Sequence, residues 1–96
     1  MKSQIKYKNS TDFGKDLGFS LFEIELIRQK KALVEKLKNA RKAKGISQAN
    51  LAKMIFTQQP AIARMESGQI GEISLDFLCK IALALNVSVT IKAKVA

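Results

Sequence analysis

Residues 48–68 read QANLAKMIFTQQPAIARMESG, and this stretch decides the fold. It predicts two short helices joined by about three residues, with the small Ala52 where the helices approach each other, which is the plan of a helix-turn-helix. The apolar residues spaced to face a shared core are Leu51, Ile55, Ile62 and Met65. The outer side carries short amides, a small residue and a guanidinium, at Gln58, Gln59, Ala61 and Arg64. A generic helical hairpin would explain the apolar spacing but not these outer groups, because amides and guanidinium groups match the hydrogen-bonding edges of bases.

A long helix is predicted before this unit. Ser20 and Glu23 have the spacing of a capping box, in which each side chain satisfies a free amide at the start of a helix. Apolar residues then recur at helical spacing as far as Lys44, and Gly45 is suited to end the helix. A helix of this length is unusual in so small a domain, so a break near residues 29–31 is an alternative.

Three more helix starts carry capping residues. Ser47 and Thr57 are the expected caps of the two helices in the helix-turn-helix, and Ser74 is the expected cap of one further helix that ends at Asn86. Pro60 falls in the first turn of its helix, where the missing N–H costs nothing. The four main helices therefore have defined starts.

The two ends of the chain differ in pattern. Residues 87–95 alternate apolar and polar and are rich in β-branched side chains, which predicts a strand. Residues 1–19 are expected to be weakly structured or to bind a partner, with one short helical turn within residues 11–19. The chain is expected to be a single domain overall, with the helix-turn-helix DNA-binding part and the C-terminal strand in residues 20–96. The predicted fold is all-α: a compact bundle of about five helices with a short C-terminal β-strand.

Composition excludes several classes of protein. The 96 residues suffice for one modest hydrophobic core. No apolar run is long enough to span a membrane, and the first ten residues lack the apolar segment of a signal peptide. The lone Cys79 cannot form an internal disulfide, which favours a reducing cytosol. Because there is no His, imidazole-based metal sites and His-based catalysis are excluded. We expect no enzyme activity, cofactor or metal.

The positive charge is confined to one part of the chain. Residues 1–27 hold four Lys and four acidic residues, whereas residues 28–96 hold thirteen Lys and Arg against four acidic residues and so carry the whole net charge of +9. A basic part beside a neutral part suggests that one side faces a polyanion, although a solvated basic surface is the simpler alternative.

Two runs resemble the Cro/repressor-like (Xre) helix-turn-helix regulators: Gly45-Ile46-Ser47-Gln48-x-x-Leu51-Ala52, then Gln59-Pro60-Ala61-Ile62-x-Arg64-Met65-Glu66-x-Gly68. The match extends without gaps from residue 41 to 68 and continues through residues 74–89. Looser motifs resemble one branch of that family, the HigA-type antitoxins of bacterial toxin–antitoxin modules. These motifs are Asp16-Leu17-Gly18-Phe19, Ile73-Ser74-Leu75-Asp76-x-Leu78 and the C-terminal strand. The resemblance implies a lambda-repressor-like bundle that binds double-stranded DNA.

The resemblance also implies roles for individual residues. Gln48 would bond a phosphate, and Gln59 would reach a base, preferentially adenine. Gln58 and Arg64 would add phosphate or guanine contacts, and the expected DNA-binding residues are Lys44, Ser47, Gln48, Lys53, Thr57, Gln58, Gln59, Ala61 and Arg64. For the two Lys residues, simple solvation is an equal alternative.

An ion pair between Arg41 and Glu66 is also implied by the resemblance. It would link the long first helix to the end of the recognition helix. The alternative is two exposed charges of little energetic worth.

Three positions depart from the family pattern. Phe56 stands where the family commonly has Gly in a left-handed turn, so the turn is either strained, at a cost of about 1–2 kcal/mol, or follows another path. Pro60 replaces a polar side chain, which predicts apolar readout there. The loop 69–73 contains no basic residue, so any phosphate contact in it would come from backbone N–H groups.

A homodimer is expected, because proteins of this type bind paired half-sites of a palindromic operator. The predicted strand offers a pairing element, antiparallel across a two-fold axis, with Val87, Val89 and Ile91 packing on the last helix. The alternative is a dimer through helix 75–85, with the strand folded back on its own subunit.

Three functions are consistent with these patterns. The first is an antitoxin that represses its own operon and neutralises a small basic toxin, by resemblance an mRNA endoribonuclease. The second is a stand-alone phage-type or Xre-type repressor, and the third is an interaction module whose helix-turn-helix is vestigial. Phe13, Phe19 and Phe22 in the neutral N-terminal third suit a partner surface, although they could simply cover the core.

Overall fold

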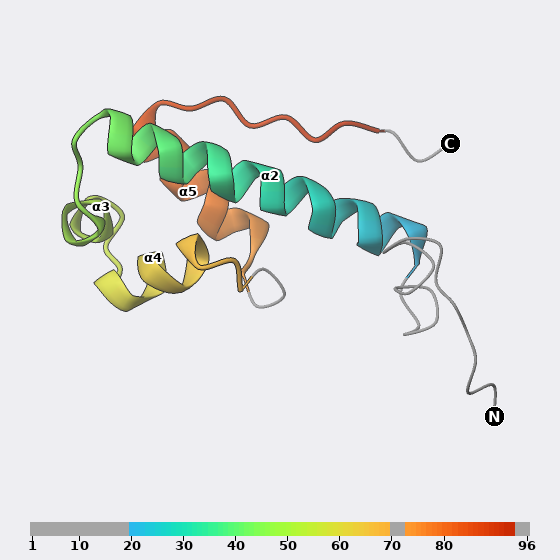
Figure 1. Ribbon diagram of the computed structural model, residues 1–96, viewed down its shortest axis with the longest axis horizontal. Coiled ribbons are helices and arrows are strands. Elements are labelled where there is room, and N and C mark those ends of the chain that lie inside the picture. The colour runs from blue at the N-terminus through green and yellow to red at the C-terminus, as the bar shows by residue number, and fades with distance from the viewer. Residues whose placement is uncertain (1–19, 70–72, 94–96) are drawn as a thin grey trace.

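The computed structural model describes residues 20–69 and 73–93. These residues form four helices: α2 (Leu21–Ala43), α3 (Gln48–Met54), α4 (Gln59–Glu66) and α5 (Leu75–Leu85). Figure 1 shows α3, α4 and α5 gathered around the C-terminal half of α2. The predicted all-α class is confirmed, but about five helices were expected, and the short turn within residues 11–19 lies outside the described residues. No helix in the described ranges has the length and apolar character needed to cross a bilayer.

Helix α2 begins at the predicted capping box. The backbone N–H of Glu23 donates to Ser20 Oγ at 3.1 Å, and the N–H of Ser20 donates to Glu23 Oε1 at 3.0 Å. The helix continues without the break considered near residues 29–31. The helix ends at Ala43, and the expected Gly45 follows the C-cap Lys44 with a left-handed φ of 68°.

The caps of α3 and α5 also agree with the sequence. Ser47 Oγ accepts from the N–H of Asn50 at 3.0 Å, and Ser74 Oγ accepts from the N–H of Phe77 at 3.1 Å. Asn86 ends α5 with a left-handed φ of 56°, which Asn tolerates better than most residues. Serine hydroxyls thus fix where both helices begin.

The start of α4 differs from the prediction. The N-cap residue is Gln58 rather than Thr57, and it makes no side-chain capping bond. The N–H of Thr57 instead donates to the carbonyl of Ala52 at 2.9 Å, which closes the end of α3. Because α4 begins at Gln59, the N-cap position falls on Gln58, and Thr57 lies one residue too early to cap this helix. Pro60 lies in the first turn of α4, as expected.

One core holds the four helices together. Its buried apolar side chains come from every helix: Leu33, Val34, Leu37, Leu51, Ala52, Ile62, Met65, Leu78, Ile81, Ala82 and Leu85. The α2 residues among them all lie in its C-terminal half. Ile27 is the first α2 residue that packs against this core, and the turn before it leaves Leu21 and Phe22 exposed.

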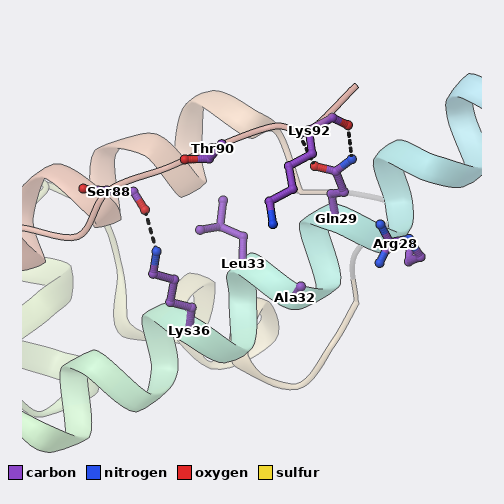
Figure 2. A pocket seen from close by; sticks show the side chains of 8 residues that line it. All are labelled: Arg28, Gln29, Ala32, Leu33, Lys36, Ser88, Thr90 and Lys92. Atoms are coloured by element: carbon purple, nitrogen blue, oxygen red, sulfur yellow. Dashed lines mark hydrogen bonds between the residues drawn. The ribbon is translucent and has the colours of Figure 1, made fainter. Parts of the chain in front are cut away.

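The predicted strand is not formed. Residues 87–93 are extended but are assigned to no strand, because a strand needs a neighbour and the described part of this single chain offers none. The segment runs back alongside α2, and Figure 2 shows the side chains that hold it there. Gln29 donates from Nε2 to the Lys92 carbonyl at 2.6 Å and accepts the Lys92 N–H at 2.7 Å. Lys36 Nζ donates to the Ser88 carbonyl at 2.9 Å.

The predicted dimerisation residues divide into two kinds. Val87 and Val89 are half-buried and pack against the core, whereas Ile91 leaves 47% of its surface exposed. In this chain, then, the apolar face of the segment is only partly covered.

Candidate nucleic-acid interface

The outer side of α4 is polar and accessible. Gln58, Gln59 and Arg64 are exposed and Ala61 is half-buried, while Ile62 on the opposite side is fully buried. The division follows from helical spacing, since apolar residues three and four apart face the core together. The four residues predicted to face outward therefore lie along the outward side of α4.

A side-chain amide of α3 holds the first residue of α4. Gln59 donates from Nε2 to Gln48 Oε1 at 2.6 Å, and Gln48 donates from Nε2 to Glu66 Oε1 at 2.9 Å. Gln48 thus bridges the beginning and the end of α4 from the neighbouring helix. This arrangement fixes the amide of Gln59 on the accessible edge of the helix-turn-helix.

The ion pair between Arg41 and Glu66 is present and enclosed. Arg41 donates from Nε to Glu66 Oε2 at 2.6 Å and from Nη2 to Oε1 at 2.9 Å, and its Nη1 donates to the carbonyl of Ile46 at 2.7 Å. Only 10% of the Arg41 side chain and 6% of the Glu66 side chain are exposed. The two-point geometry ties α2 to α4 and to the start of α3.

Burial and hydrogen bonding act in opposite directions on Glu66. Burial alone would raise the pKa of the Glu66 carboxyl, but the hydrogen bonds from Arg41 and Gln48 outweigh burial and lower that pKa below its ordinary value. The carboxylate accordingly stays ionised at neutral pH. Among the described residues, no buried side-chain nitrogen or oxygen lacks a hydrogen-bond partner.

The held amide of Gln59 retains the groups needed to read a base. Its NH₂ carries two N–H donors, of which Gln48 takes one, and within the described residues its Oε1 accepts no hydrogen bond. One donor and one acceptor in a single plane match the N7 and N6 positions of adenine in the major groove. The geometry is therefore compatible with bidentate recognition of adenine.

The helices of this unit and the end of α2 carry exposed cations. Lys44, Lys53 and Arg64 are all exposed, and the acidic Glu66 of α4 is neutralised by Arg41. Ser47 is exposed but its hydroxyl already caps α3, and Thr57 is half-buried. The surface can attract a polyanion without an exposed carboxylate in α3 or α4 to oppose it.

The bridging role of Gln48 was missed by sequence reasoning, which assigned it to a phosphate. Only the crossing of α3 over α4 brings Gln48 within reach of both Gln59 and Glu66. A polar residue at the first position of α3 is the sole signal, and it is equally consistent with a phosphate contact. Of the two alternatives for the turn at Phe56, the structure has the strained one, because Phe56 adopts a left-handed φ of 58°.

One expectation concerns the loop that follows α4. Any phosphate contact in the loop 69–73 was expected to come from backbone N–H groups, but residues 70–72 lie outside the described residues. Within residues 20–69 and 73–93, no three His, Cys, Asp or Glu side chains are grouped so as to hold a metal ion.

Comparison with known proteins gives one clear result. A family model described as helix-turn-helix matches residues 37–92, more than half of the chain. No curated protein and no solved structure gives a significant match. The matched range includes all of α3, α4 and α5 together with Arg41, Gln48, Gln59 and Glu66. The chain belongs to the helix-turn-helix family of the Cro/repressor (Xre) type, a family of DNA-binding transcription regulators.

Proposed function

We propose that this chain recognises a specific operator by placing the beginning of α4 in the major groove of DNA. The observation that carries this proposal is the fixed amide of Gln59, held by Gln48 at 2.6 Å on an accessible edge. A pre-positioned side chain loses less conformational entropy on binding, so more of its hydrogen-bond energy contributes to discrimination between bases. In this arrangement Gln59 reads adenine.

Neighbouring side chains hold the protein on the DNA backbone. Lys44 and Lys53 contact phosphates through their exposed ammonium groups, and Gln58 and Arg64 reach phosphate or guanine. Gln48 serves the interface by positioning Gln59, and its remaining N–H can still donate to a phosphate. These contacts give register and affinity, whereas Gln59 gives sequence preference.

The operator is palindromic and the protein binds it as a homodimer. One short recognition helix buries too little surface for tight specific binding. The extended residues 87–93 support a dimer, since within the described residues the backbone groups of residues 89–91 make no hydrogen bond. We place the two-fold contact there, as an antiparallel pair with the same segment of a second copy through Val87, Val89 and Ile91. A truncation lacking residues 87–96 that remained dimeric by light scattering would instead place the dimer contact on α5.

The DNA proposal is tested with a duplex enriched from a random pool by the wild-type protein. Gln59→Ala is expected to lose about 1–3 kcal/mol of binding free energy on that duplex and to relax preference at one base position. Lys53→Ala is the matched control, because loss of a phosphate contact weakens all duplexes equally and flattens the salt dependence. Unchanged affinity of Gln59→Ala would reject the assigned recognition helix.

We propose as a second candidate that the regulator is also an antitoxin that represses its own operon. An exposed apolar hollow supports a protein partner: Phe22, Leu26 and Ile91 line it, and 73% of Phe22 is exposed. Residues 21–36 of α2 precede the range matched by the family model, which begins at residue 37. A surface added to the regulator in this way suits a small basic toxin of the mRNA endoribonuclease class. A stand-alone repressor would have no toxin partner. An interaction module with a vestigial helix-turn-helix would have no DNA target.

A direct assay separates these candidates. The product of the neighbouring gene would be purified and tested for inhibition of cell-free translation, and this chain would then be titrated into the reaction. An antitoxin restores translation at equimolar protein, and Phe22→Ser restores it less well, whereas Gln59→Ala restores it fully. A neighbouring product that inhibits nothing favours the stand-alone repressor.

A further inference from the structure

Phe56 stands out among the residues that end the helices. Residues 45, 56 and 86 follow α2, α3 and α5 with φ angles of 68°, 58° and 56°. Gly45 and Asn86 are residue types that accept this left-handed backbone, whereas a bulky side chain there is strained. The chain therefore keeps an unfavourable residue at the turn between α3 and α4.

Packing does not account for this strain. The exposed fraction of Phe56 is 96%, the largest among the exposed apolar side chains of the described residues. Its ring gains no burial in the core, and the turn itself is held by backbone hydrogen bonds from Phe56 to Lys53 and from Thr57 to Ala52. A Gly would make both bonds with less strain. A strained residue with no internal contact points to an external one.

The position of Phe56 identifies the external surface. It precedes Gln59 by three residues, so the two Cα atoms are separated by at most about 11 Å, which is close to the width of the major groove, about 12 Å. The residues beside it, Lys53 and Gln58, are an exposed cation and an exposed amide. A protein partner seated on this turn would exclude the recognition helix from DNA. DNA fits the surroundings better.

We propose that the ring of Phe56 packs against an apolar surface of the operator at the edge of the major groove. This inference rests on the proposed function. Two DNA groups offer that surface, the 5-methyl of a thymine and the deoxyribose of the backbone. Phe56 is thus a further affinity-determining residue, outside α4, whose contact offsets the strain of its turn only when DNA is bound.

The test compares stability with affinity in the full chain. Phe56→Gly and Phe56→Asn both relieve the turn, so the unfolding midpoint is expected to stay the same or rise. Affinity for the enriched duplex is expected to fall about five- to tenfold in both variants, as burial of part of a Phe ring is lost. Leu21→Ala is the control, because Leu21 is an apolar side chain that is 42% exposed at the start of α2, outside the helix-turn-helix, and the affinity of this variant should not change.

Replacing single thymines of the duplex by deoxyuridine identifies the DNA group. If one replacement weakens wild-type binding but not binding by Phe56→Gly, the contact is a thymine methyl. If no replacement separates the two proteins while Phe56→Gly remains weaker, the contact is deoxyribose. Equal affinity of wild type and Phe56→Gly overturns the inference. A loss of affinity in a variant whose mass in solution has fallen from dimer to monomer also overturns it, because the lost dimer would then explain the weaker binding. If the wild type enriches no duplex, the proposed function itself fails.

Discussion

The two halves of α2 are one continuous helix in very different surroundings. Its C-terminal half contributes Leu33, Val34, Leu37 and Arg41 to the buried interior, whereas its N-terminal half leaves Leu21, Phe22 and Leu26 exposed. The family model begins at residue 37, within the buried half. One element therefore supports the core of a DNA-binding unit at one end and presents an exposed apolar surface at the other.

An Arg–Glu ion pair also contributes differently to stability at the two ends of α2. Each half of α2 holds an Arg that pairs with a Glu, Arg28 with Glu25 of the same helix and Arg41 with Glu66 of α4. The side chains of Arg28 and Glu25 are 54% and 21% exposed, whereas those of Arg41 and Glu66 are 10% and 6% exposed. Solvent screens the first pair and the first pair does not join two helices. The buried pair therefore contributes to the packing of α2 against α4, whereas the exposed pair contributes little to the stability of the fold.

The largest effect is expected from Glu66→Gln. The substitution strands the Arg41 guanidinium in a buried place and weakens the bond from Gln48, so the free energy of unfolding should fall by about 3–5 kcal/mol. Urea denaturation followed by circular dichroism measures the loss.

Arg28→Gln is the matched control at the exposed end, and its denaturation curve should coincide with that of the wild type. Equal losses in Glu66→Gln and Arg28→Gln would remove the distinction between the two pairs.

Acid should act on the same pair. Because the folded state lowers the pKa of Glu66 below its ordinary value of 4.5, the unfolded state binds more protons between those two values. The stabilisation is complete above about pH 4.5 and is lost as the pH falls through the folded-state pKa. Urea midpoints measured from pH 7 to pH 3 should decline in the wild type. The decline should be shallower in Glu66→Gln, and parallel curves would mean that another group controls acid sensitivity.

Much of this fold was predictable because its signals are local. The capping serines at positions 20, 47 and 74 and the left-handed Asn86 depend on only a few neighbouring residues, and all four were located correctly. The family resemblance also gave the Arg41–Glu66 pair, which joins residues far apart in sequence.

The sequence was less informative about which partner a group meets and about the residue at which α4 begins. Thr57 was expected to cap α4, but that helix begins at Gln59, so Gln58 takes the N-cap position. A strand was expected over residues 87–95, but the described residues 87–93 form none, and the backbone of Lys92 binds the side chain of Gln29 instead. The phosphate contact expected of Gln48 stays a prediction, and its additional use as a bridge could not be foreseen because it depends on the crossing of two helices. Periodicity specifies conformation, but it does not specify which partner is nearest.

A smaller effect is expected from removing matched helix caps. Ser74→Ala removes the acceptor for the N–H of Phe77 at the start of α5, whose residues fill the core, so it should cost about 1 kcal/mol of global stability. Ser20→Ala removes the same kind of bond at the exposed end of α2, where the first turn can fray without opening the core. Thermal denaturation should show a shift for Ser74→Ala and almost none for Ser20→Ala. A shift of similar size in both would show that the exposed end unfolds together with the core.

The smallest effect on global stability is expected at the junction of the exposed half with residues 87–93. Gln29→Ala removes both hydrogen bonds to the backbone of Lys92, but these lie at the surface and beyond the core contacts of Val87 and Val89. The free energy of unfolding should therefore change by no more than about 0.5 kcal/mol.

Locally the result should be clear, because the Gln29 amide is the only group within the described residues that binds the backbone of Lys92. Amide hydrogen exchange at Lys92 should accelerate in Gln29→Ala, while exchange in α5 should stay as in the wild type. Lys36→Ala is the control, since it removes a bond to the Ser88 carbonyl and leaves the Lys92 N–H held by Gln29. If residues 87–93 pair with a second copy in solution, protection at residues 89–91 should persist in Gln29→Ala and decrease on dilution to monomer. Slow exchange that depends neither on Gln29 nor on concentration would mean that neither the Gln29 bonds nor a second copy orders residues 87–93. The difference in stability between the two halves of α2 would then need another physical explanation.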